Sequence, residues 1–133
     1  MTKTRIILLI FGALAFFMVA FTYFYARQAY PSSVCINTEQ SRTLSPDGAY
    51  EAVLFERQCG ENASRSAHIS IFTAGTELEN SFGNAVIVKG SAEDAFGPLS
   101  WSGTTINVAL SSDDVLSVTE APLPDVTVNL TRN

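Results

Sequence analysis

Residues 45–60 read SPDGAYEAVLFERQCG, and the order of residue types in this stretch decides the fold. In Ser45-Pro46-Asp47-Gly48 the proline presets φ at the first corner, the aspartate can bond its own backbone, and the glycine tolerates positive φ, so these residues predict a hairpin turn. A strand follows over Tyr50 to Arg57, and its centre, Ala52 to Phe55, is apolar at every position. A run that is apolar on both faces predicts an inner strand that is covered on both sides.

Short strands are also predicted on either side of this stretch. Ser102-Gly103 is a two-residue connection of hairpin type, and after it Ile106, Val108 and Leu110 alternate with polar or small residues, as on a half-buried strand. The expected strands are 41–44, 50–57, 68–72, 84–89, 98–101, 104–110, 115–118 and 125–131. Beyond the first thirty residues no stretch has a convincing helical period. The sequence therefore predicts a mainly β domain, an antiparallel β-meander folded as a sandwich or open barrel of about seven strands.

The first thirty residues have a different character. Ile6 to Tyr25 is a run of 20 residues without a charge, and at about 1.5 Å per residue a helix of that length spans the roughly 30 Å hydrocarbon core of a bilayer. Lys3 and Arg5 precede the run, so the positive-inside rule predicts a cytoplasmic N-terminus. The expected organisation is a cytoplasmic tail (1–5), a transmembrane signal anchor (6–26), a tether (27–38) and an extracytoplasmic β domain (39–133).

A cleavable signal peptide is the alternative to an uncleaved anchor. Its apolar core would be shorter, about 7 to 15 residues, with small residues at the −3 and −1 positions. Cleavage after Ala26 would place Phe24 at −3, and cleavage after Ala29 would place Arg27 there. Both sites are poor, so the sequence favours the uncleaved anchor.

The only two cysteines are Cys35 and Cys59, and both lie in the exported part. Thiols oxidise in such compartments, and two cysteines allow a single intramolecular pairing. Closing a loop of about 25 residues stabilises the fold by roughly 3 to 3.5 kcal/mol in the chain-entropy model. A metal or redox site would need a CxxC pair or nearby histidines, which the sequence lacks. A structural disulfide is therefore predicted, with no metal and no cofactor.

The exported part is acidic. From Pro31 onward there are thirteen acids and five of the eight cations, a formal charge of −8 against −5 for the whole chain. This balance argues against nucleic acid as a partner and would favour a basic one. The alternative is that the acids only keep the domain soluble.

Few residues are candidates for a catalytic role. His68, the only histidine, is expected to be a half-buried or surface side chain of a strand; Ser66 or Ser70 could pair with it on paper, but no nucleophile motif supports a triad. No catalytic residue is predicted. Trp101 is expected at the core end of its hairpin.

Two adjacent acid pairs are expected in loops, Glu93-Asp94 and Asp113-Asp114. They form the candidate acidic binding surface, since paired carboxylates can serve as glycosidase acid and base or as calcium ligands. Neighbours in sequence usually point apart, and neither pair has the spacing of a calcium loop. Solvated turn residues are the alternative.

The stretch SPDGAYEAVLFERQCG, with Ser70-Ile71, the tract from Gly83 to Val88 and the hairpin at Trp101, resembles a widespread group of small bacterial envelope proteins, many of them lipoproteins. Members have an SPDG turn and a strand that ends in Arg-x-Cys-Gly. The resemblance would cover Cys35 to Asn133 and implies a β fold and an envelope location. Gln58 and Glu61-Asn62 depart from the group's pattern around Cys59. No catalytic residue can be transferred.

These observations predict a non-enzymatic binding module of the bacterial inner membrane. Ile6 to Tyr25 would cross the lipid bilayer once, and the periplasmic domain would bind another envelope protein, as an inhibitor or immunity protein or as an accessory subunit. The alternative is an envelope hydrolase or small-ligand receptor that uses loop carboxylates.

Overall fold

The computed structural model describes residues 2–29 and 35–133, which belong to two compact units, Met1–Val34 and Cys35–Asn133. In the first unit α1 (Lys3–Ala29) is one continuous helix. Its segment Lys3–Ala26 is 24 residues long and contains an 18-residue stretch with a mean hydropathy of 2.5 and no buried residue, so it is long and apolar enough to cross a membrane. By length and composition alone, such an N-terminal helix is a candidate membrane anchor or signal sequence.

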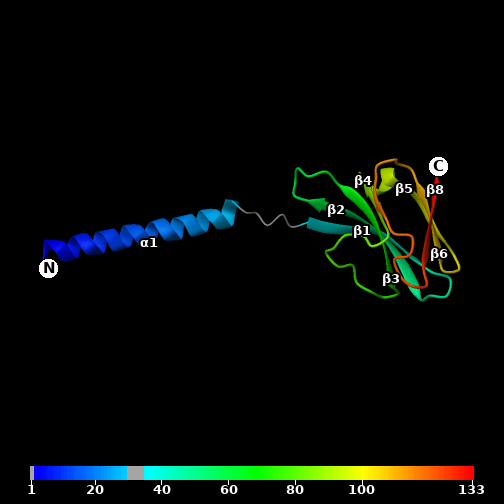
Figure 1. Ribbon diagram of the computed structural model, residues 1–133, viewed down its shortest axis with the longest axis horizontal. Coiled ribbons are helices and arrows are strands. Elements are labelled where there is room, and N and C mark those ends of the chain that lie inside the picture. The colour runs from blue at the N-terminus through cyan, green and yellow to red at the C-terminus, as the bar shows by residue number, and fades with distance from the viewer. Residues whose placement is uncertain (1, 30–34) are drawn as a thin grey trace. The chain divides into compact units, whose positions relative to one another are not determined.

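The second unit, Cys35–Asn133, is the β domain, a sandwich of two sheets (Figure 1). Its elements are β1 (Cys35–Leu44), β2 (Tyr50–Cys59), β3 (Ser66–Thr73), β4 (Val86–Lys89), α2 (Ala92–Ala95), β5 (Phe96–Ser102), β6 (Thr105–Leu110), β7 (Val115–Val118) and β8 (Thr127–Arg132). The strand order is β1-β2-β3-β4-β7 in the larger sheet and β5-β6-β8 in the smaller. The predicted mainly β fold with one apolar N-terminal helix is confirmed.

The path between the sheets is less regular than a simple meander. The loop expected over 90–97 contains the helical turn α2, after which the chain enters the smaller sheet as β5. From β6 it crosses to the larger sheet for β7 and returns as β8, so β8 runs parallel to β6, the one parallel pair among the described strands. Two parallel neighbours cannot be joined by a hairpin and need a crossover connection, which here passes through β7.

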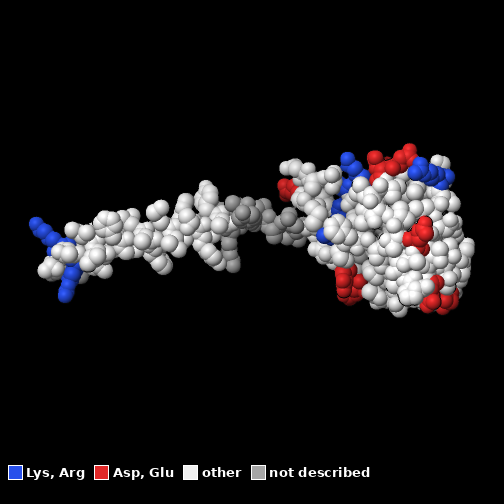
Figure 2. All heavy atoms as spheres, in the orientation of Figure 1, with Lys and Arg blue, Asp and Glu red and all other residues white. Residues whose placement is uncertain are grey.

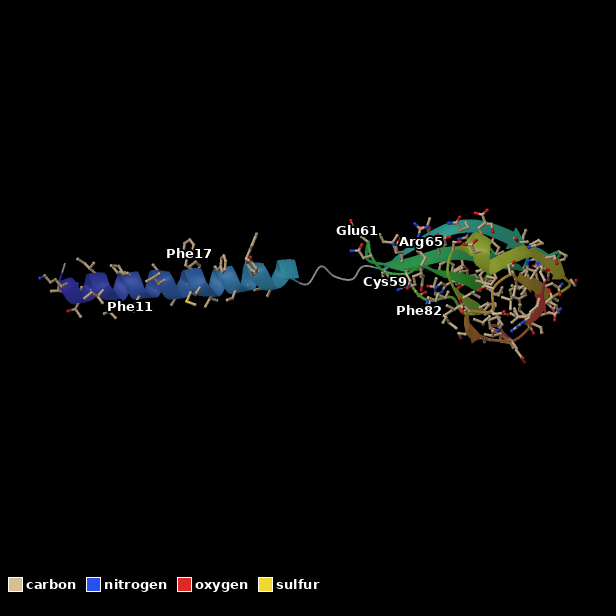
Figure 3. The ribbon with its side chains drawn as sticks, turned by 90° about the horizontal axis from the view of Figure 1, so that it is seen from above. Phe11, Phe17, Cys59, Glu61, Arg65 and Phe82 are labelled. Atoms are coloured by element: carbon tan, nitrogen blue, oxygen red, sulfur yellow. A yellow bond between two sulfur atoms is a disulfide. The ribbon has the colours of Figure 1, made fainter. Side chains whose placement is uncertain are left out.

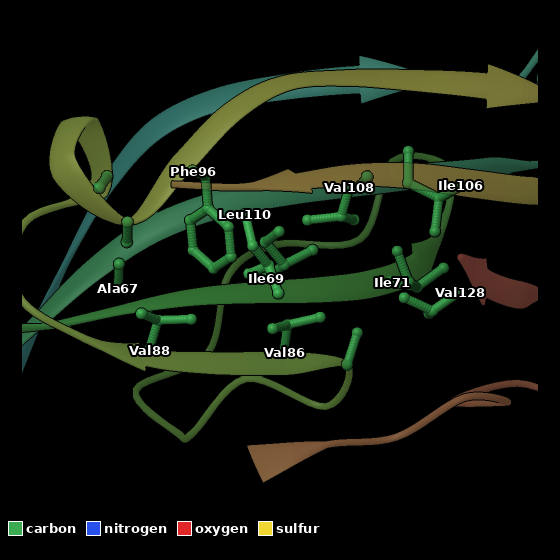
Figure 4. Close-up of a cluster of buried hydrophobic side chains, with 14 of the residues drawn as sticks. Ala67, Ile69, Ile71, Val86, Val88, Phe96, Ile106, Val108, Leu110 and Val128 are labelled. Atoms are coloured by element: carbon green, nitrogen blue, oxygen red, sulfur yellow. The ribbon is translucent and has the colours of Figure 1, made fainter. Parts of the chain in front are cut away.

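The hydrophobic core lies between the two sheets. From β3 and β4 the side chains of Ala67, Ile69, Ile71, Val86 and Val88 meet those of the smaller sheet (Figure 4). The smaller sheet contributes Phe96, Ile106, Val108, Leu110 and Val128. The alternation predicted for β6 is confirmed, since Ile106, Val108 and Leu110 are its buried residues.

Residues 45–60 form the predicted turn and inner strand. Gly48 has φ +73°, its N–H donates to the carbonyl of Ser45 at 2.9 Å, and the Ser45 hydroxyl donates to Asp47 Oδ1 at 2.6 Å. β2 pairs with β1 on one side and β3 on the other. Ala52 faces the core, whereas Val53 and Phe55 face the opposite side and are also fully buried.

The predicted disulfide is present. Cys35 and Cys59 are bonded, and they are also register partners at one end of the β1–β2 ladder. The expected tether, 27–38, overlaps both neighbouring elements, since α1 extends to Ala29 and β1 begins at Cys35; its remaining part, residues 30–34, lies outside the described residues. Residues 35–38 belong to the sheet because they pair with β2, and the disulfide fixes their end of the ladder.

Candidate functional site

The outer face of the larger sheet is covered by the loop between β3 and β4, residues 74–85, which we call the strap. Val53 and Phe55 of β2 and His68 and Ser70 of β3 lie on this face, away from the smaller sheet, yet each is at most 1 % exposed. An uncovered sheet face would leave these side chains in solvent. The strap therefore forms a third layer over the middle of the sheet.

Polar side chains of β1, β2 and β3 bond to the strap along its length. At its start Arg42 donates to the carbonyl of Thr76 at 2.9 Å, and Glu51 accepts the Gly75 N–H at 3.2 Å. In the middle Asn37 donates to the carbonyls of Glu79 and Ser81 at 3.0 and 2.8 Å.

The last part of the strap is bonded to β3. Asn84 Oδ1 accepts the Ile71 N–H at 2.7 Å, and Asn84 Nδ2 donates to the Ile71 carbonyl at 2.8 Å. The Asn84 N–H donates to the Ser70 hydroxyl at 3.2 Å. Together these bonds hold the strap in one position although it has no regular secondary structure.

Arg57 is the buried charge beneath the strap. The residue is 8 % exposed, and its Nη1 donates to Asn37 Oδ1 at 2.8 Å and Asn80 Oδ1 at 3.0 Å. Among the described residues no carboxylate lies within 4 Å of the guanidinium, and Nε has no hydrogen-bond partner. The Phe82 ring covers the guanidinium, with its centroid 4.7 Å from Cζ. Neutral amide oxygens and an aromatic face thus compensate this charge, in place of an ion pair.

His68 and Ser66 form a hydrogen-bonded pair that resembles part of a catalytic triad. His68 Nε2 lies 2.7 Å from the Ser66 hydroxyl, and Nδ1 lies 2.9 Å from the backbone nitrogen of Gly83. A backbone N–H can only donate, so Nδ1 must have the free lone pair and Nε2 the proton. His68 therefore donates to Ser66 and, in this tautomer, cannot take the serine proton.

The surroundings of the imidazole favour the neutral form. Burial, and secondarily the positive charge of Arg57, lowers the pKa of His68 to about 4. The ring is stacked on Phe55 at a centroid distance of 5.1 Å and is 0 % exposed. The prediction of a half-buried or surface histidine was wrong, because the strap closes the side of the sheet on which the ring lies.

The two acid pairs lie at one end of the β domain. Glu93 and Asp94 are in α2, and the N–H of Ser111 donates to the carbonyl of Ala95 at 3.0 Å, which joins the loop of Asp113 and Asp114 to the end of α2. We call these four residues the acidic end. In Figure 2 the acidic groups over α2 lie beside basic groups.

Two of the four carboxylates are engaged in local bonds. Asp94 accepts the Ser91 hydroxyl at 2.7 Å, and Asp113 pairs with Arg132 at 2.7 Å. Asp113 also lines a groove of about 90 Å³, well below the roughly 300–1,000 Å³ of small-molecule sites. The described residues contain no group of three or more His, Cys, Asp or Glu placed to share a metal ion.

Trp101 and Glu56 form hydrogen bonds that join separate elements of the β domain. Trp101 packs against the core, as predicted, and its Nε1–H donates to the Thr43 carbonyl at 2.9 Å, which joins β5 to β1. Glu56 accepts the Ala92 N–H at 2.8 Å, and its carboxylate lies 3.6 Å from the Arg65 guanidinium.

The sequence analysis did not identify Arg57 and Phe82 as residues of interest. Arg57 could have been noticed, since it shares a strand face with Val53 and Phe55, which predicts partial burial.

None of the protein-family models, curated proteins or solved structures compared with the chain matches it. The resemblance to the group of bacterial envelope proteins stays a prediction.

Proposed function

We propose that this protein is a membrane-anchored binding module of the bacterial inner membrane. α1 would cross the bilayer once with the N-terminus in the cytoplasm, and the β domain would lie in the periplasm. The helix Lys3–Ala26 is long and apolar enough for this role, and the Cys35–Cys59 disulfide fits an oxidising compartment. The cations Lys3 and Arg5 precede the apolar run, as the positive-inside rule requires.

One observation favours binding over catalysis: the side chains that could act as nucleophile, acid or base are already bonded to other groups of the chain. The Ser66–His68 pair has the tautomer that leaves the serine unactivated, and Glu56, Asp94 and Asp113 are bonded to nearby groups of the chain. The module would therefore act through its surface. The formal charge of −8 from Pro31 onward favours a basic envelope protein as partner. The partner would be a hydrolase or toxin that the module inhibits, or a complex in which the module is an accessory subunit.

An envelope hydrolase or small-ligand receptor is the second candidate. It would need the loop carboxylates to converge on a cavity. The acid pairs do lie at one end of the domain, but the groove beside Asp113 is about 90 Å³.

Detergent extraction of the full-length chain, followed by size-exclusion chromatography with light scattering, tests the binding function. The proposal expects a complex of fixed stoichiometry that dissociates as salt is raised, because ionic contacts between exposed groups are screened. A species containing only this chain at every salt concentration would contradict the proposal. The genes beside this one would distinguish an inhibitor from an accessory subunit.

Protease protection tests the topology. The β domain should be digested in spheroplasts and protected in intact cells, while the intact mass of the membrane-bound chain should include α1. A mature chain that begins near Arg27 would show that α1 is a cleaved signal sequence.

A further inference from the structure

The strap exposes one large aromatic side chain between two fixed points. Phe82 is 67 % exposed. The residue before it, Ser81, accepts Asn37 Nδ2 at 2.8 Å through its carbonyl, and the residue after it, Gly83, donates its N–H to the buried His68. The ring itself rests on the guanidinium of Arg57. In Figure 3 Phe82 lies at the same end of the β domain as Cys59.

The strap also packs closely against β3 at Gly83. A Cβ at Gly83 would lie 2.9 Å from His68 Cβ and 2.9 Å from the Ile69 carbonyl oxygen. The backbone at Gly83 thus lies too close to β3 for any side chain at this position. A single exposed phenylalanine is ordinary on a protein surface, but a firmly held one is a preorganised anchor that loses little conformational freedom on binding.

The charges on the strap indicate which kind of partner would contact Phe82. Glu77 and Glu79 are exposed, and neither forms an ion pair within residues 35–133. The neighbouring cations do not neutralise them, because Arg42 pairs with Glu39 and Glu51 and Arg57 is buried under Phe82. The exposed surface of the strap is therefore apolar and anionic.

We propose that Glu77, Glu79 and Phe82, the strap surface, dock a basic segment of a partner protein. Phe82 enters an apolar pocket of the partner, and the two carboxylates pair with its lysine or arginine side chains. This inference rests on the proposed binding function and assigns it to the strap, in place of the acidic end. The acidic domain would repel an anionic lipid surface, which makes the membrane the less suitable occupant.

Site-specific photo-crosslinking of the full-length chain in its native membrane tests this assignment. The probe is Phe82→p-benzoyl-phenylalanine, and the control has the same probe at Leu116, which is 63 % exposed on β7. The proposal expects a discrete adduct from position 82 whose partner peptide contains lysine or arginine. The adduct should fall at least tenfold in Glu77→Lys/Glu79→Lys and persist in the matched variant Glu93→Lys/Asp94→Lys.

The other outcomes overturn the proposal in distinguishable ways. A protein adduct from position 116 alone, or one lost only in Glu93→Lys/Asp94→Lys, refutes the strap and leaves the binding function standing. The absence of a protein adduct from both positions refutes the strap, and the stoichiometry of the detergent-extracted species then decides separately whether the binding function stands. An adduct to lipid or to a second copy of this chain, or one indifferent to both charge reversals, refutes docking of a basic partner. Thermal unfolding checks that each variant is folded. The four replaced carboxylates are exposed and form no ion pair within residues 35–133, and p-benzoyl-phenylalanine keeps an aromatic ring at position 82.

Discussion

Lowering the pH from 8 to 5 should destabilise the β domain through protonation of His68. The imidazole is buried, Nδ1 accepts the Gly83 N–H, and Arg57 adds a positive charge nearby. Protonation would place a second donor opposite that N–H and a charge in a buried site. The folded state therefore resists protonation, and the pKa of His68 is lowered from 6.5 to about 4.

The sign and size of the effect follow from linkage. With a folded pKa below the unfolded one, the unfolded chain binds more protons between the two values, so stability is complete above pH 6.5 and falls as the pH decreases towards 4. At 1.36 kcal/mol per pKa unit, the loss should be about 2 kcal/mol at pH 5 and about 3 kcal/mol once the pH is below 4.

Urea unfolding of the full-length chain in detergent micelles measures this loss at pH 8, 7, 6 and 5. Since His68 is the only histidine, the imidazole signals in the NMR spectrum report its titration without ambiguity. The non-titrating variant His68→Gln should have a lower stability at pH 8 and a much smaller slope with pH. A wild-type stability that is constant from pH 8 to 5, or an imidazole that titrates near 6.5 in the folded protein, would refute the reasoning.

Three further changes test the packing of the β domain by urea unfolding at pH 8. Cys35→Ser/Cys59→Ser should cost roughly 3 kcal/mol because the unfolded chain regains the entropy of a closed loop; an unchanged midpoint would contradict this. Gly83→Ala should cost about 1–3 kcal/mol, since the new Cβ would lie 2.9 Å from His68 Cβ and from a carbonyl oxygen, and amide exchange at position 83 should accelerate. Trp101→Phe should cost about 1–3 kcal/mol because the Thr43 carbonyl loses its indole donor; a stability equal to wild type would show that water replaces that bond.

Much of the fold follows from local patterns in the sequence. The proline, aspartate and glycine of residues 45–48 specify the turn, the period-two alternation of Ile106, Val108 and Leu110 specifies a strand with one buried face, and an uncharged run of 20 residues specifies an apolar helix. Even the two-sided burial of β2 could be predicted, because Val53 and Phe55 are apolar on the face that the core does not cover. In each case the signal lies within a few residues of the structure it specifies.

The parallel pairing of β6 with β8 and the environment of His68 depend on the tertiary structure. The parallel pair of β6 and β8 requires a crossover connection, which here passes through β7 of the other sheet, and no residue pattern within β6 or β8 indicates this connection. His68 lies between Ala67 and Ile69 in an ordinary strand, and its burial comes from the strap, which reaches it from fifteen residues away. The sequence alone determined the apolar helix, the disulfide and most of the strands, since these depend on neighbouring residues or on a single pairing. The covered sheet face, the neutral histidine and the exposed Phe82 depend on how distant segments pack, and this only the tertiary structure decided.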